Sequence, residues 1–152
     1  MSQIMDVDRT TTRFNPQMNF QTVIENEYKE WLFHIYFFQK NADQVHAALQ
    51  LREAVLRLRL DGAFVAVPHF RVNEGPVGPH PVGSYEVWVL NETFASTFSY
   101  LCQNRGDLSI LIIPLSKDQY RDYSSRATWM GHPLPLDLSA LPQKTLDNRL
   151  SL

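Results

Sequence analysis

The sequence lacks most of the features that identify a protein class directly. Its single cysteine, Cys102, excludes an internal disulfide, and its apolar surroundings favour a small packed residue over a nucleophile. Lys and Arg total 14 against 16 Asp and Glu, with no basic block, so we expect no nucleic-acid partner. No apolar run could span a bilayer, and the first residues lack the basic and apolar regions of a signal peptide. We therefore expect a cytoplasmic protein with no membrane partner.

The hydrophobic pattern indicates one globular domain of alternating short elements. The 152 residues are 44% hydrophobic and 20% charged, which is typical of a folded chain with a sizeable core. Asn41 or Asp43 can cap the clearest helix, and Gly62 suits the left-handed position after its end. A second helix begins at Asn91 or Thr93. The predicted elements are a strand over 31–38, a helix over 42–60, strands over 63–67 and 85–90, a helix ending near 104, and a strand over 108–113.

This order of elements predicts an α+β fold of the ferredoxin-like βαββαβ type. In that topology a four-stranded antiparallel sheet carries two helices on one face, and the first and third strands form the central pair. The other face is open unless a tail or a second subunit covers it, so we expect a homodimer. We divide the chain into an N-terminal arm (1–27), the domain (28–141) and a C-terminal tail (142–152). Within the domain, after the last strand, we expect one helical turn near 117–123.

Strand alternation predicts a polar cluster on the open face of the sheet. Side chains of a strand point alternately to the two faces, so the set Phe33, Ile35 and Phe37 suits packing under the helices. The opposite face then carries the polar and aromatic residues of the two central strands: His34, Tyr36, Glu86 and Trp88. Such a cluster suits a small-molecule pocket, although a satisfied His–Glu pair under a covering tail is an equally valid interpretation.

A rigid turn stands at the entrance of the strand that carries Glu86. Proline on both sides of His80 fixes the backbone and removes two hydrogen-bond donors, so the imidazole is held in a stiff loop. Taken alone, this stretch is more typical of a connector between strands than of a site.

Several blocks of the chain resemble the DOPA 4,5-dioxygenase family over roughly residues 30–141. The most specific block is Gly78-Pro79-His80-Pro81 followed by Glu86-Val87, and further similar blocks lie at 31–38, 108–115, 126–131 and 135–139. The resemblance implies a ferredoxin-like fold. It also implies an extradiol dioxygenase in which ferrous iron inserts both oxygen atoms of O₂ into a catechol.

The chain departs from that family pattern at three histidines. Leu32 stands where the family shows the first histidine of His-x-His, Ile113 replaces the histidine before the proline of the last strand, and Tyr123 follows Asp122 in place of histidine. His34, His80 and Glu86 match. Apolar Leu32 and Ile113 raise the cost of holding a dication, so we interpret the chain as a divergent member that has lost the iron chemistry.

The candidate site residues follow from the cluster and from the resemblance. We expect catalytic roles for His34, His80, Glu86 and Tyr123, the last donating a hydrogen bond in place of an imidazole. Expected substrate-binding residues are Leu32, Tyr36, Trp88, Leu111, Ile113, Trp129 and His132. We expect no metal and no cofactor; if a metal binds, the alternative is Fe²⁺ on His34, His80 and Glu86.

Three functions remain open from the sequence. The first is a metal-independent isomerase or cyclase that acts on an apolar or aromatic small metabolite, in a setting such as fungal secondary metabolism. The second is a working extradiol dioxygenase, and the third is a non-catalytic small-molecule-binding protein. Among other polar residues, we interpret His69 as a loop or hairpin residue and His46 as solvent-facing on the long helix. Arg71 could pair with a substrate carboxylate, but we favour a surface role for it.

Overall fold

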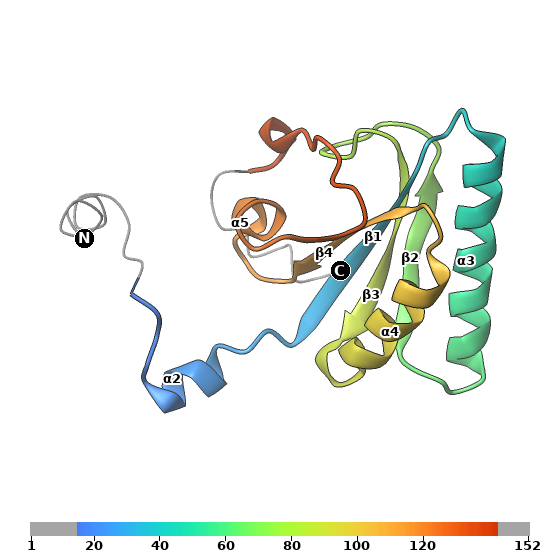
Figure 1. Cartoon of the computed structure of the whole chain (residues 1–152). Helices are drawn as coiled ribbons and strands as arrows, with labels where there is room; N and C mark the ends of the chain where they lie inside the picture. The colour runs from blue at the N-terminus through green and yellow to red at the C-terminus, as the bar shows by residue number, and fades with distance from the viewer. Residues whose placement is uncertain (1–14, 143–152) are drawn as a thin grey trace.

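A computed structural model of the chain describes residues 15–142, except for the side chain of Phe70. One antiparallel sheet has α3 and α4 packed against one face, and the C-terminal segment with α5 lies on the other side (Figure 1). The elements are α2 (Phe20–Glu25), β1 (Glu30–Phe37), α3 (Ala42–Leu60), β2 (Ala66–Asn73), β3 (Gly83–Leu90), α4 (Phe94–Asn104), β4 (Ser109–Pro114), α5 (Gln119–Tyr123) and β5 (Thr128–Met130). Short 3-10 helices cover Asn91–Thr93 and Leu138–Ala140.

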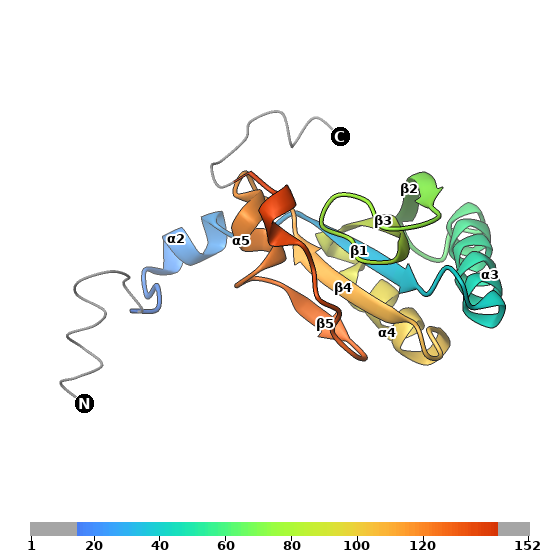
Figure 2. The same cartoon turned by 90° about the horizontal axis from the view of Figure 1, so that it is seen from above.

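The strand order β2-β3-β1-β4-β5 confirms the ferredoxin-like topology, with one strand added at an edge. β1 pairs with β3 over all eight of its residues, and its other side pairs with β4. The added strand, β5, lies beside β4 (Figure 2). We predicted a loop there, because three residues are too few to produce a recognisable alternation.

β2 is longer than the sequence predicted, because Pro68 does not end it. The strand runs to Asn73 and pairs with β3 alone, so it forms an edge of the sheet within the described residues. Proline is tolerated on an edge strand, where its missing N–H faces away from the ladder. His69 therefore lies on a strand and not in a loop, opposite Glu86.

The long helix follows its sequence signals closely. α3 covers the predicted range 42–60, and the Asn41 side chain accepts a hydrogen bond from the Gln44 backbone N–H at 3.1 Å. Gly62 has a φ of 87°, the left-handed conformation expected just after the helix. His46 is exposed, as predicted. None of the helices in residues 15–142 is long and apolar enough to cross a membrane.

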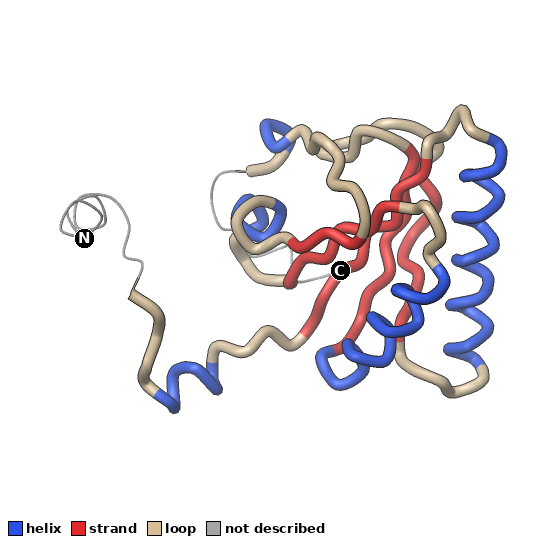
Figure 3. Tube along the Cα trace, in the orientation of Figure 1, coloured by secondary structure: helices blue, strands red, loops and turns tan. Residues whose placement is uncertain are grey.

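The two faces of the sheet carry separate cores. Phe33, Ile35 and Phe37 pack under the helices, as the alternation predicted. The other core lies on the β1–β4 half of the opposite face, where residues 115–141 cover it. Its buried members are Leu32, Tyr36, Leu111, Ile113, Leu115, Tyr123 and Leu141. Most of the covering segment is loop (Figure 3), yet it seals this half of the face.

The predicted domain boundaries fall partly outside the described residues. Residues 1–14 of the arm and 143–152 of the tail are not described, whereas α2 gives the rest of the arm one short helix. The homodimer and the cytoplasmic location stay predictions.

Candidate active site

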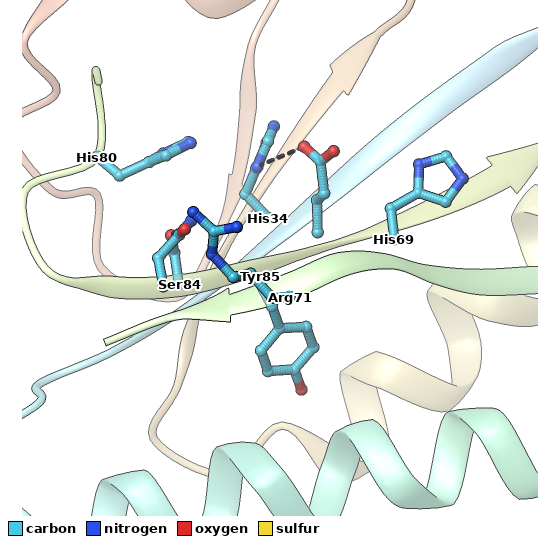
Figure 4. A pocket seen from close by; sticks show the side chains of 8 residues that line it. His34, His69, Arg71, His80, Ser84 and Tyr85 are labelled. Atoms are coloured by element: carbon cyan, nitrogen blue, oxygen red, sulfur yellow. Dashed lines mark hydrogen bonds and ion pairs between the residues drawn. The ribbon is translucent and has the colours of Figure 1, made fainter. Parts of the chain in front are cut away.

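A polar cavity of about 290 Å³ lies over β1, β2 and β3, on the sheet face opposite the helices. It occupies the half of this face that the C-terminal segment leaves uncovered. β1 contributes one residue, β2 and β3 contribute three each, and the loop between β2 and β3 adds one. The lining residues are His34, His69, Arg71, Asn73, His80, Ser84, Tyr85 and Glu86 (Figure 4). The Tyr85 ring itself points to the helix side of the sheet, where its hydroxyl donates to the Ala48 carbonyl at 2.7 Å.

His34 and Glu86 form the floor of the cavity. They are direct partners in the β1–β3 register, which confirms the pairing expected from the strand alternation. His34 Nδ1 lies 3.6 Å from Glu86 Oε2, and the histidine is only 1% exposed while the carboxylate side chain is 20% exposed. A carboxylate beside Nδ1 favours the proton on that nitrogen, so Glu86 orients the ring.

Tyr123 engages the other nitrogen of His34. Its hydroxyl lies 3.0 Å from His34 Nε2, and both side chains are buried. A neutral imidazole has one donor and one acceptor nitrogen, so Glu86 and Tyr123 together occupy both. α5 brings Tyr123 to this point from 89 residues along the chain.

His80 is held rigidly at the side of the cavity. Reciprocal backbone hydrogen bonds join it to Val77, and the Asp137 N–H donates to the Pro79 carbonyl at 2.9 Å, so the C-terminal segment fixes the turn. His80 Nδ1 lies 2.8 Å from the Tyr36 hydroxyl, and the His80 ring centroid is 4.9 Å from that of His34. Among the described residues, Nε2 of His80 has no protein partner.

Burial keeps this second pair uncharged. Desolvation lowers the pKa of His80 from 6.5 to about 4. Burial, with smaller contributions from Tyr123 and Glu86, raises the pKa of Tyr36 well above its usual value. At neutral pH the cavity therefore contains a neutral His80 imidazole beside a protonated phenol.

The low pKa of His80 predicts a loss of stability in mild acid. Below pH 6.5 the unfolded chain binds a proton at His80, whereas the folded chain binds it only near pH 4. The free energy of unfolding therefore falls as the pH drops through this window. In urea unfolding, His80 should lower the free energy of unfolding by about 2 kcal/mol when the pH is reduced from about 7.5 to about 5. His80→Gln should remove that part of the pH dependence, whereas His46→Gln on the exposed face of α3 should not. Equal pH dependence in wild type and His80→Gln would contradict the assigned environment.

β2 supplies residues that the sequence reasoning did not include among the expected site residues, although it weighed Arg71 as a partner for a substrate carboxylate. His69 stacks on Trp88 at 5.9 Å between ring centroids with 8° between the planes, and burial lowers its pKa. Arg71 is exposed, as predicted, yet its side chain lines the cavity. Asn73 donates to the Ser84 hydroxyl at 3.1 Å. If the predicted strand had been continued through Pro68, the prediction would have placed these residues beside the strand that carries Glu86.

Most of the predicted substrate-binding residues do not line the cavity. Leu32, Leu111 and Ile113 lie in the buried core under the C-terminal segment, and Trp88 and Trp129 pack against that core. The C-terminal segment fills the space that those side chains face, so they lie in a covered core and not at the walls of this cavity. Their neighbour Tyr36 contacts the site without lining the cavity: its hydroxyl lies on His80, and its ring stacks on that of His34 at 6.4 Å between centroids. His132 is exposed and does not line the cavity.

The chain belongs to the Dopa 4,5-dioxygenase family. A sequence profile of this family matches residues 31–140, which include every residue that lines the cavity. The match confirms the resemblance noted from the sequence, and the antiparallel sheet with its helices agrees with the fold that the resemblance implied.

Two curated fungal proteins are similar in sequence to this chain. DOPA 4,5-dioxygenase from Amanita muscaria is 61% identical over 136 residues, which are 90% of this chain and 60% of that protein. An uncharacterized 21.2 kDa protein from Botryotinia fuckeliana is 41% identical over 114 residues, 70% of this chain and 60% of that protein. The chain thus spans about 60% of the length of these curated relatives.

A solved structure shows the same fold. The crystal structure of a Nostoc punctiforme PCC 73102 protein, described provisionally as a dioxygenase, matches with a TM-score of 0.62 and 28% identity. The match covers 74% of this chain and 90% of that protein.

Proposed function

We propose that the cavity is the active site of a metal-independent enzyme, which moves protons in a redox-neutral isomerisation or cyclisation of a small metabolite. The observation that carries this proposal is that protein groups already engage both ring nitrogens of His34, which is one of the ligands that an iron would need. Glu86 and Tyr123 flank the two nitrogens of His34, and the Tyr36 hydroxyl contacts Nδ1 of His80.

The expected iron ligands do not fit a ferrous centre. Non-haem Fe(II) sites use two histidines and a carboxylate on one face of the metal, with open positions for O₂ and substrate. Coordination through His34 would break its contact with Tyr123 or with Glu86. In residues 15–142, no group of three His, Cys, Asp or Glu side chains is arranged to hold a metal ion. We therefore propose acid–base chemistry and assign no step to a metal.

His80 is the group best placed to transfer a proton. Its Nε2 has no protein partner among the described residues, and its ring points toward His34 (Figure 4). Because the ring is neutral at pH 7, it can take a proton from a substrate carbon and return it to another atom, with no net oxidation. The nearby Glu86 carboxylate stabilises the imidazolium that forms in between.

The polar lining changes the expected substrate. We predicted an apolar or aromatic metabolite, but the apolar side chains behind that prediction lie in the covered core. The side chains that form the cavity walls are histidines, an arginine, an asparagine, a serine and a carboxylate, because the Tyr85 ring packs in the core under the helices. We propose a small metabolite that carries polar groups on a short carbon skeleton.

Hydrogen exchange tests this function with simple keto acids in place of the natural substrate. We expect the protein, treated with a chelator in D₂O, to accelerate exchange of the C3 hydrogens of pyruvate, 2-oxobutanoate or related short keto acids, followed by NMR. Keto–enol exchange is the simplest redox-neutral proton transfer, so a site of this kind should catalyse it. Exchange no faster than in buffer across the panel, or exchange that requires added iron, would contradict the proposal.

A dioxygenase is the second candidate, and it is favoured by the 61% identity to a protein named DOPA 4,5-dioxygenase. It requires the contacts around His34 to rearrange before iron could bind. A non-catalytic binding protein would show ligand binding with neither hydrogen exchange nor oxygen uptake.

A further inference from the structure

We propose that Arg71, Asn73 and Ser84 form a carboxylate-binding subsite at the mouth of the cavity, so that the ligand is a small carboxylic acid. The proposal rests on the proposed function, because it assumes that this cavity is the substrate site. It assigns roles to residues of β2 and β3 that the acid–base chemistry does not use.

Arg71 is a cation with no anionic partner among residues 15–142. Its guanidinium makes no hydrogen bond and no ion pair with any residue that the structure describes, although its side chain lines the cavity. In the close-up view the guanidinium lies beside Ser84, on the side of the sheet that carries His34 and His80 (Figure 4). Arginine presents a planar fork of donors that matches a carboxylate in two parallel hydrogen bonds.

Ser84 provides an unused donor beside that fork. The residue is 1% exposed, and its hydroxyl oxygen accepts a hydrogen bond from Asn73 Nδ2 at 3.1 Å. The hydroxyl hydrogen has no acceptor among the described residues. A ligand oxygen at this point would accept that hydrogen and so complete the hydrogen bonding of the buried hydroxyl.

The charges of the cavity set the orientation of the ligand. Glu86 lies on the floor beside buried His34, whereas Arg71 is exposed at the mouth. An acid group is therefore repelled from the floor and attracted to the mouth, which leaves the rest of the molecule pointing toward His80. A cavity of 290 Å³ lies near the lower limit of about 300 Å³ for small-molecule sites, so the acid is a small metabolite.

A pair of probes of equal shape tests the subsite by binding alone. We would titrate the full chain with butanoate and with its neutral amide, butanamide, by calorimetry at low salt. Wild type should bind the acid more tightly than the amide. Arg71→Gln should weaken binding of the acid by about tenfold or more and leave the amide unchanged, because one charge-assisted contact is lost. Arg71→Lys should fall between the two, and Arg59→Gln on α3 should match wild type.

Three results would overturn the subsite: equal affinity of wild type for acid and amide, an acid preference that survives Arg71→Gln, or no binding of the acid at millimolar concentration. Failure of the proposed function looks different. A protein that binds the acid through Arg71 but catalyses no hydrogen exchange keeps the subsite and loses the enzyme. A protein that exchanges hydrogen with an unchanged KM in Arg71→Gln loses the subsite alone.

Discussion

Replacement of His80 by glutamine is expected to lower the rate of hydrogen exchange by about 100-fold or more. Glutamine can still hydrogen-bond the Tyr36 hydroxyl, but its amide cannot accept a proton at neutral pH. The change removes the cavity-facing Nε2 and keeps a polar side chain in the turn. The measurement is the exchange rate at saturating keto acid, with circular dichroism to verify the fold.

Two variants separate this effect from a general disturbance. His46→Gln alters an exposed histidine of α3 and should leave the exchange rate unchanged. Tyr36→Phe keeps the His80 ring but removes its hydrogen-bond partner, so it should lower the rate less than His80→Gln does. If His80→Gln retained a rate within a few-fold of wild type, His80 would not be the proton-transfer group.

Replacement of Asp122 by alanine should destabilise the fold by about 3 kcal/mol. The carboxylate is fully buried and accepts hydrogen bonds from the Ser116 backbone N–H at 3.0 Å and from its hydroxyl at 2.8 Å. Arg126 completes the cluster at 3.2 Å from Oδ1. Alanine would leave these donors without their acceptor, while the partly exposed Arg126 could recover some hydration.

The same carboxylate anchors the residue next to it, Tyr123, against His34. Urea unfolding measures the change, and Asp118→Ala is the matched control. Asp118 caps α5 through the Arg121 N–H at 3.2 Å and is more exposed, so its loss should cost about 1 kcal/mol. A loss of stability for Asp122→Ala no larger than that of Asp118→Ala would show that the buried cluster is not important for the fold.

The sheet and its register were predictable because their signals are local. Alternation along 31–38 and 85–90 placed Phe33 and Tyr85 under the helices and put His34 opposite Glu86. The helix over 42–60 followed from its cap and from the spacing of its apolar residues. These patterns depend on neighbours within a few positions, so the sequence alone contains them.

The shape of the site was not predictable for two reasons. A proline within a strand indicates a break unless the strand is known to lie at an edge, and this hid Arg71 and Asn73. The destination of a mostly irregular tail depends on long-range packing, so the sequence did not show that it covers Leu32 and Ile113. The prediction therefore brought His34, His80 and Glu86 together, but it did not identify the β2 residues that line the rest of the cavity.

Iron binding tests the central claim most directly. The protein would be produced with added iron, purified without oxygen, and measured for bound iron and for oxygen uptake with DOPA and other catechols. The acid–base account predicts iron well below one atom per chain and no oxygen uptake above the control without protein. One tightly bound iron per chain, with oxygen uptake that disappears in His34→Gln, would contradict it.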